Sequence, residues 1–223
     1  MCGRYVAQID AALEREFRVL RSWSRELVSY NVAPTQEVPV VVSVGGVREG
    51  RFMRWGLIPH FAHGQAGPYA TINARVETLR TSPAYRGAWQ RGQRCLVIAS
   101  GFYEWQVVAA AKQPWYITCA DQPHFAFAGV WDRSTLHDGG VIESVTIVTL
   151  PASPFMADIH NTKHREPAIL RAEDQETWLT GSADAAFACL KPYPDDLRSA
   201  WPVSRRVNAP KNNDAALIDP AAA

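Results

Sequence analysis

Short apolar runs at near-regular spacing constrain the fold of this chain more than any other feature of its sequence. They are rich in β-branched and aromatic residues, and turn-forming residues separate them, which is typical of β-strands. Gly45-Gly46 stands between the first two runs and predicts a β-hairpin there. We expect strands at Val38–Val44, Val47–Leu57, Arg94–Ala99, Phe102–Gln106, Pro114–Cys119, Phe125–Trp131 and Ser144–Leu150.

Helical spacing is found mainly at the margins of these runs. Leu13, Phe17 and Leu20 share one helical face behind Asp10, a residue type suited to an N-cap, so a helix is expected from Asp10 to Leu20. Two more helices are expected at 82–90 and at 172–180, and Gly181 ends the second.

This order of elements predicts an α+β fold in one domain. We expect a curved, largely antiparallel β-sheet that is open and barrel-like, with peripheral helices. The domain is predicted at residues 1–208, and residues 209–223 are expected to form a loose C-terminal tail.

Composition is that of an ordinary globular protein. At 223 residues with 47% apolar content, the chain can bury a substantial core. The sequence contains no apolar run long enough to span a bilayer and no signal-peptide pattern, so we expect a cytoplasmic protein with no membrane partner. Its cysteines are widely spaced without C-x-x-C, which argues against a disulfide framework or a zinc knuckle.

Charge is distributed unevenly along the chain. Residues 1–100 carry 13 Arg and no Lys against 7 acidic residues, a net charge of +6, whereas residues 101–223 carry 10 basic and 15 acidic residues, a net charge of −5. The planar guanidinium suits phosphate, so the first half could contact nucleic acid. An overall codon bias toward Arg and Ala is the alternative explanation.

Cys2 directly follows the initiator Met1. Removal of Met1 would leave a 1,2-aminothiol, in which an α-amine of pKa about 7.7–8.0 and a thiol of pKa about 8.5 are adjacent. Such a pair can condense with an aldehyde to a Schiff base and then close to a thiazolidine. It can also perform acyl transfer, with the amine as the base for the thiol.

Three further segments place polar residues where their neighbours predict a core. Asn73 follows a strand-like approach, where it could hold a substrate or cap the next helix. Glu104 stands between Tyr103 and Trp105, and it suits general acid–base work unless it points outward to solvent. His160 follows an apolar helix end and could carry a proton.

The two histidines of the segment that contains His160 do not indicate a metal site. His160 and His164 have the spacing of half a metal site, but the glutamate of H-E-x-x-H is missing and no third ligand is evident. We therefore expect no metal and no other cofactor.

The motifs occur in an order that resembles the SOS-response-associated peptidase (SRAP) family of abasic-site processing proteins. The resemblance extends to about Asn208. It rests on Met1–Tyr5, Tyr30–Thr35, Arg54–Pro59, Ile72–Thr78, Gly101–Trp105 and Asp158–Pro167.

The resemblance implies a DNA-damage-response protein that binds single-stranded DNA containing abasic sites. It implies that Cys2, exposed by loss of Met1, forms a thiazolidine cross-link with the ring-opened deoxyribose. Cys2 matches the nucleophile, Asn73 the amide that orients the sugar and the N-terminus, Glu104 the acid/base and His160 the second proton carrier. A monomer that associates with the nucleoid when bound to DNA is expected.

The DNA-binding surface implied by the resemblance centres on Arg4 and Arg75, which are expected to hold the phosphates that flank the lesion. Weaker candidates are Arg54 and Arg86, with Arg165 as a doubtful contact. The alternation of Arg54, Trp55 and Phe61 with turn residues also predicts stacking platforms for unpaired bases at Trp55 and Phe61, and a core position is the favoured alternative for Trp55.

Two departures from the family pattern bear on these roles. Glu166 in Arg165-Glu166-Pro167 puts an acid near the expected phosphate surface. The loop from Pro59 to Tyr69 lacks the paired tryptophans of some relatives and presents His60-Phe61 instead.

Two other functions remain open at this point. The same residues could form the site of an N-terminal-nucleophile thiol peptidase or amidohydrolase. The chain could also be a nucleic-acid-binding module in which Cys2 is inert.

Overall fold

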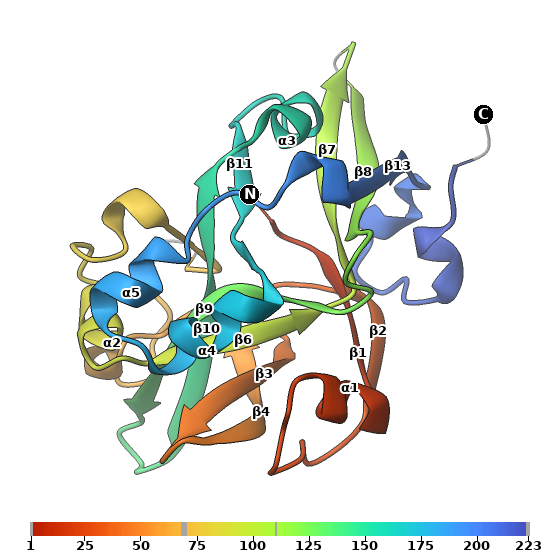
Figure 1. Ribbon diagram of the computed structural model, residues 1–223. Helices are drawn as coiled ribbons and strands as arrows, with labels where there is room; N and C mark the ends of the chain where they lie inside the picture. Colours follow the sequence, from red (N-terminus) through yellow and green to blue (C-terminus); the bar gives the residue numbers. More distant parts are fainter. Residues whose placement is uncertain (1, 68–70, 110, 222–223) are drawn as a thin grey trace.

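A closed ring of strands forms the centre of the fold (Figure 1). This computed structural model describes residues 2–67, 71–109 and 111–221. The ring closes because β9 pairs with both β6 and β10, and within it only β10 and β4 run parallel. Its strands in ring order are β10 (Val141–Pro151), β4 (Val47–Trp55), β3 (Glu37–Val44), β6 (Arg94–Ala99) and β9 (Phe125–Thr135).

A second sheet and several short elements surround this ring. The sheet has the order β13 (Arg198–Pro202), β8 (Ala111–Cys119), β7 (Gly101–Val108), β1 (Tyr5–Ile9) and β2 (Leu27–Val32). Short strands β5 (Asn73–Arg75) and β11 (Arg165–Pro167) pair with β10, and β12 (Ile169–Leu170) pairs with β9. The α-helices are α1 (Ala11–Glu16), α2 (Arg86–Gln90), α3 (Pro154–Ile159), α4 (Gln175–Thr180) and α5 (Ala183–Ala188). The 3₁₀ turns are η1 (His60–Ala62), η2 (Val76–Thr78), η3 (Ala172–Asp174), η4 (Asp195–Leu197), η5 (Arg205–Asn208) and η6 (Ala215–Ile218).

Both faces of β6 are buried, which explains its uninterrupted apolar sequence. Cys95 and Val97 belong to a core cluster shared with side chains of β1 and β7. Leu96 and Ile98 belong to a second cluster shared with side chains of α1 and α4. The central ring is therefore covered by the second sheet on one side and by helices on the other, as predicted for an α+β fold.

The predicted hairpin forms as expected. Val44 pairs with Val47, so Gly45-Gly46 is a two-residue turn. Both glycines have positive φ, 58° at Gly45 and 80° at Gly46, which suits the tight turns that match the twist of paired strands.

The first helix is shorter than the sequence predicted. Asp10 caps it as expected, with its carboxylate accepting from the backbone N–H groups of Ala12 and Leu13 at 2.9 Å each. Arg18 then adopts a left-handed φ of 53°, which ends the helical path before Leu20, and Leu20 is exposed.

The C-terminal segment corrects the expectation of a loose tail. Residues 209–221 pack against the second sheet, and Leu217 is completely buried. The side-chain amide of Asn31 donates to the backbone oxygens of Ala209 at 3.1 Å and Asn212 at 2.7 Å. These buried hydrogen bonds fix a segment whose polar composition suggested mobility.

Candidate active site

The four predicted catalytic residues come from separate elements and meet beside the start of the chain. Cys2 precedes β1, Asn73 begins β5, Glu104 lies within β7 and His160 follows α3. All four are buried, with exposed fractions of 0% for Cys2, 2% for Glu104, 5% for His160 and 8% for Asn73. Polar side chains this deeply buried need defined partners.

Asn73 fixes the backbone of the nucleophile. Its Nδ2 donates to the backbone oxygen of Cys2 at 2.8 Å. Its own main chain is held by pairing with Ile147 of β10 and by the hydroxyl of Tyr85, which donates to the Asn73 oxygen at 3.2 Å. Among the described residues, Asn73 Oδ1 is buried with no hydrogen-bond partner, so it is an acceptor that a substrate hydroxyl could use.

Glu104 and His160 form a pair suited to proton transfer. His160 Nε2 lies 4.0 Å from Glu104 Oε2. His160 Nδ1 lies 2.8 Å from the backbone oxygen of Arg165 and 3.4 Å from the Arg165 backbone nitrogen. The shorter contact is to an oxygen that only accepts, which favours the tautomer with the proton on Nδ1. In the neutral ring, Nε2 is then the proton acceptor facing Glu104. Glu104 does not point outward to solvent, because it lies in the buried first half of β7.

The Cys2 thiol is held in its protonated form. Burial raises its pKa well above the usual range, and the negative charge of Glu104 raises it further. The thiol lies 3.9 Å from the backbone oxygen of Arg4, a weak contact for S–H. A buried thiol beside a carboxylate is the opposite of the electropositive setting that activates a free thiolate.

A pocket of ≈450 Å³ leads to this pair. Glu104 and His160 line it together with the half-buried Trp105. Lys112 and Lys163 also line it, and both lie outside the arginine-rich first half of the sequence, whose charge pointed to the phosphate contacts. Its size lies within the usual range for small-molecule sites.

The predicted phosphate contacts differ in how accessible they are. Arg75 and Arg86 are exposed. Arg4 is half-buried, and its Nη1 donates to Asn31 Oδ1 at 3.0 Å and to the backbone oxygen of Val207 at 2.8 Å. Burial lowers the pKa of Arg4 from its usual value. Arg4 therefore holds the C-terminal segment against the N-terminal strand, besides any contact with DNA.

The two predicted stacking platforms differ in their exposure to solvent. Phe61 is 55% exposed, as a platform requires. Trp55 is fully buried, and its indole N–H donates to the backbone oxygen of Ile72 at 2.9 Å. The prediction that Trp55 stacks on bases is therefore corrected: it packs in the core and supports the strand that carries Asn73.

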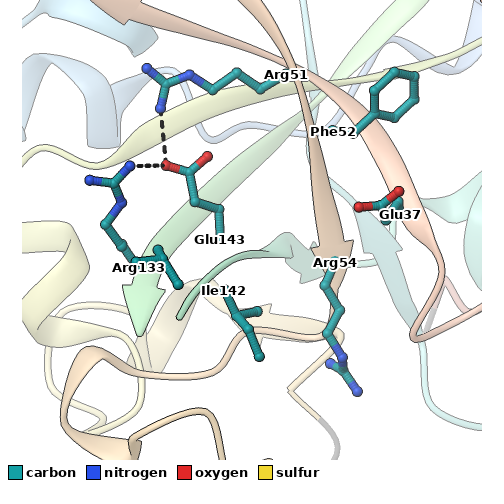
Figure 2. Close-up of a pocket in the computed structure, with 8 residues that line it drawn as sticks. Glu37, Arg51, Phe52, Arg54, Arg133, Ile142 and Glu143 are labelled. Carbon is teal, nitrogen blue, oxygen red and sulfur yellow. Dashed lines mark hydrogen bonds and ion pairs between the residues drawn. The ribbon is translucent and has the colours of Figure 1, made fainter. Parts of the chain in front are cut away.

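Arg54 lies in a separate surface pocket of ≈560 Å³ (Figure 2). Its Nη1 donates to the backbone oxygen of Gly56 at 2.7 Å. In the same pocket, Glu143 accepts from Arg51 at 3.2 Å and forms an ion pair with Arg133 at 3.2 Å, so two of the three guanidiniums already have a carboxylate partner. Figure 2 draws these two contacts and none between Arg54 and the carboxylates of this pocket.

Arg165 and Glu166 face the interior. The side chain of Arg165 pairs with Glu77 and donates to the backbone oxygen of Thr149 at 2.7 Å. Glu166 is completely buried and pairs with Arg198 at 2.8 Å. The expectation of an acid at the phosphate surface is thus corrected, and the doubt about Arg165 as a DNA contact agrees with its burial.

The described part of the chain contains no group of three or more His, Cys, Asp or Glu side chains that could hold a metal ion. His164 is exposed and lies in the loop between α3 and β11.

None of the helices in the described ranges is long and apolar enough to cross a membrane.

The fold and site define a class of protein in which a cysteine at the second position is held beside an amide and a Glu–His pair on an α+β, barrel-like scaffold. The family model described as SOS response associated peptidase (SRAP) matches residues 1–210. This chain belongs to that family.

Individual relatives agree with this assignment. The chain is 38% identical over 195 residues to the abasic site processing protein YoaM of Bacillus subtilis, covering 86% of this chain and 84% of the relative. It is 31% identical over 234 residues to the abasic site processing protein YedK of Escherichia coli, covering 99% and 100%. A solved structure from Bordetella bronchiseptica aligns with a TM-score of 0.81 at 29% identity, covering 91% and 100%.

Proposed function

We propose that this protein processes abasic sites in single-stranded DNA and forms a covalent cross-link through Cys2 after Met1 is removed. The observation that carries the proposal is the convergence of Asn73 and Glu104 on Cys2, with His160 behind Glu104. The names of the relatives as abasic site processing proteins support the same substrate. We further propose that the protein acts as a cytoplasmic monomer that associates with the nucleoid when bound to DNA.

The first step is condensation of the Cys2 amine with the aldehyde of the ring-opened sugar. Ring opening requires a proton at the ring oxygen, and dehydration of the carbinolamine requires a proton on the departing hydroxyl. Glu104 and His160 are placed to deliver and recover these protons. The products of this step are an imine and one water.

The second step is ring closure by the thiol. The Cys2 sulfur adds to the imine carbon, and its proton ends on the imine nitrogen, so the thiazolidine forms with no further loss of atoms. Because the pKa of the thiol is raised by burial and by Glu104, the amine reacts first and the thiol follows. Asn73 keeps the Cys2 backbone oriented during both steps.

The thiol environment favours this reaction over peptidase or amidohydrolase activity. A cysteine that attacks an amide needs its pKa lowered by a nearby cation or base. The raised pKa of Cys2 disfavours direct attack as thiolate. An inert Cys2 in a simple binding module would leave the buried Glu104–His160 pair without a role.

The test is a cross-linking time course on denaturing gels with an oligonucleotide that contains one abasic site. We expect an adduct with this oligonucleotide and none with the undamaged strand. A tetrahydrofuran analogue of the abasic sugar is the matched control, because it cannot open to an aldehyde. Equal adduct yield with the analogue, or cleavage of peptides at a rate comparable to cross-linking, would contradict the proposal.

A further inference from the structure

Two lysines line the mouth of the catalytic pocket. The chain has only 4 Lys against 19 Arg, yet Lys112 and Lys163 both line the pocket that contains Glu104 and His160. Lys112 belongs to β8, and Lys163 belongs to the loop between α3 and β11. Two unrelated segments therefore each bring an ammonium group to one opening.

The two segments are tied together by specific hydrogen bonds. Lys112 pairs with Val107 across the β7–β8 hairpin. Asn161, in the same loop as Lys163, donates to the Val107 oxygen at 2.9 Å and accepts from the Val107 N–H at 3.0 Å. Gln106 adds a third tie by donating to the backbone oxygen of Asp158 at 2.9 Å. The two segments that carry the lysines are thus joined at the backbone of Val107.

Their charges are available to a ligand. Both lysines are exposed, and within the described residues neither forms an ion pair with a carboxylate. Two of the arginines near the catalytic residues in sequence are occupied, since Arg4 holds Asn31 and Val207, and Arg165 pairs with Glu77. A third, Arg75, is exposed but does not line this pocket. The lysines are therefore the accessible cations that line this pocket.

We propose that Lys112 and Lys163 bind the backbone phosphate of single-stranded DNA next to the abasic sugar. The inference rests on the proposed function and adds the residues that position the strand. An ammonium binds phosphate as a mobile point charge, which suits a flexible single strand whose phosphate need not meet a planar fork. With the phosphate held at the mouth, the sugar reaches Glu104 and His160 in the pocket.

The decisive variants are the double replacement Lys112→Ala and Lys163→Ala, and the double replacement of both by Arg, which keeps the charges. The matched control is Lys191→Ala with Lys211→Ala, which removes two charges from residues that do not line the pocket. At limiting oligonucleotide, we expect the Ala pair to cross-link about 10-fold more slowly, and the salt slope of binding to fall by about 0.7, the value for one phosphate neutralised on a single strand. The cross-linking rate of the Ala pair at saturating oligonucleotide should change little. The Arg pair should be close to wild type in both cross-linking rate and salt slope.

Neutral methylphosphonate linkages beside the abasic site provide the second measurement. In wild type, these linkages should weaken DNA binding as much as the two Ala replacements do. In the Ala pair, they should have little further effect on binding. The proposal would be overturned if the Ala pair and the Lys191/Lys211 control had equal cross-linking rates and salt slopes. It would also be overturned if methylphosphonate linkages weakened binding by the Ala pair as much as binding by wild type. Two measurements separate the two proposals: lysine-dependent binding of a strand without an aldehyde tests the phosphate contact alone, and adduct formation with the abasic strand tests the cross-linking function. Lysine-dependent binding of the first strand together with no adduct on the abasic strand would sink the cross-linking function and leave the phosphate contact standing.

Discussion

At the residue scale, the proposed reaction assigns a different role to each of four residues, Cys2, Asn73, Glu104 and His160. Asn73 holds the backbone of Cys2, and Glu104 influences its thiol by charge. His160 is oriented by the Arg165 oxygen so that its Nε2 faces Glu104. Each residue therefore has a separable role, and single replacements should affect different steps.

Cys2→Ser should form a transient imine but no heat-stable adduct, because a hydroxyl closes onto the imine far less favourably than sulfur. Borohydride reduction should trap the imine of the Ser variant, and the heat-treated, unreduced sample should show none. Cys189→Ser is the matched control and should cross-link like wild type. A heat-stable adduct from Cys2→Ser at wild-type yield would refute ring closure by sulfur.

Glu104→Gln should slow adduct formation by about 10² or more, in line with loss of a positioned acid/base, while DNA binding stays nearly intact. It should also lower the pKa of the Cys2 thiol toward its usual value, because the charge of Glu104 is one cause of the raised pKa. Iodoacetamide labelling of Cys2 across alkaline pH, read by peptide mass, measures this shift.

The control for this replacement is Glu26→Gln at an exposed carboxylate. An unchanged labelling profile in Glu104→Gln would mean that its carboxylate does not act on the thiol. Loss of DNA binding in step with the rate would mean that Glu104 maintains the fold instead.

The sequence predicted which residues belong to the site where a motif marked them, but it did not predict the contacts that those residues make. Asn73, Glu104 and His160 stood out as polar residues in apolar surroundings. Trp55 looked like a stacking platform because adjacent letters do not show which face of a strand is covered. Arg4 looked free because its partner Val207 lies 203 positions away in the chain.

At the scale of elements, α3 is held by a buried ion pair that places His160. Glu166 in β11 accepts from Arg198 Nη2 at 2.8 Å and from the backbone N–H of Ser153, at the N-cap of α3, at 2.8 Å. The helix ends directly before His160, whose ring is bonded to Arg165 of the same strand β11. One carboxylate thus connects the start of the helix to the strand that orients the histidine.

Glu166→Gln should lower the free energy of unfolding by about 3 kcal/mol, because it leaves the buried Arg198 without its close counterion and only Asp195 remains, at 3.9 Å. Urea unfolding measures this loss. Combining Glu166→Met with Arg198→Met should recover much of it, since both charges are gone.

The His160 ring provides the readout of positioning. Its NMR signals should move in the Glu166 variants if this pair places the histidine. Unmoved signals together with full destabilisation would show that the ion pair stabilises the fold without orienting His160.

Elements with local signals were predicted well. The β3–β4 hairpin has its glycine turn and β6 its apolar run, and both form where expected. Strands β1 and β2 and the ordered segment after residue 208 were missed. Their sequences are mixed, and pairing partners and buried hydrogen bonds from distant parts of the chain hold them in place.

For the whole molecule, the closed ring and the second sheet create a deeply buried interior that includes several phenols. Burial raises the pKa of Tyr116 to about 12. A phenol in the unfolded chain titrates near pH 10. Above about pH 10 the unfolded state therefore binds fewer protons than the folded state, so the stability falls as pH rises toward about 12.

Urea unfolding at rising alkaline pH should show this loss. Tyr116→Phe removes the titration, at the expense of the contact between the Tyr116 hydroxyl and the Ser100 oxygen, and should flatten the decline. An equally steep decline in Tyr116→Phe would assign the alkaline sensitivity to other groups.

The central claim is that Cys2, freed of Met1, joins an abasic sugar through both its nitrogen and its sulfur. Intact mass of the protein after incubation with a single-stranded oligonucleotide bearing one abasic site tests this most directly. We expect a species equal in mass to the Met1-free chain plus the oligonucleotide minus one water, and peptide mapping should place the adduct on Cys2. An adduct that retains Met1, one that maps to another residue, or no adduct would contradict it.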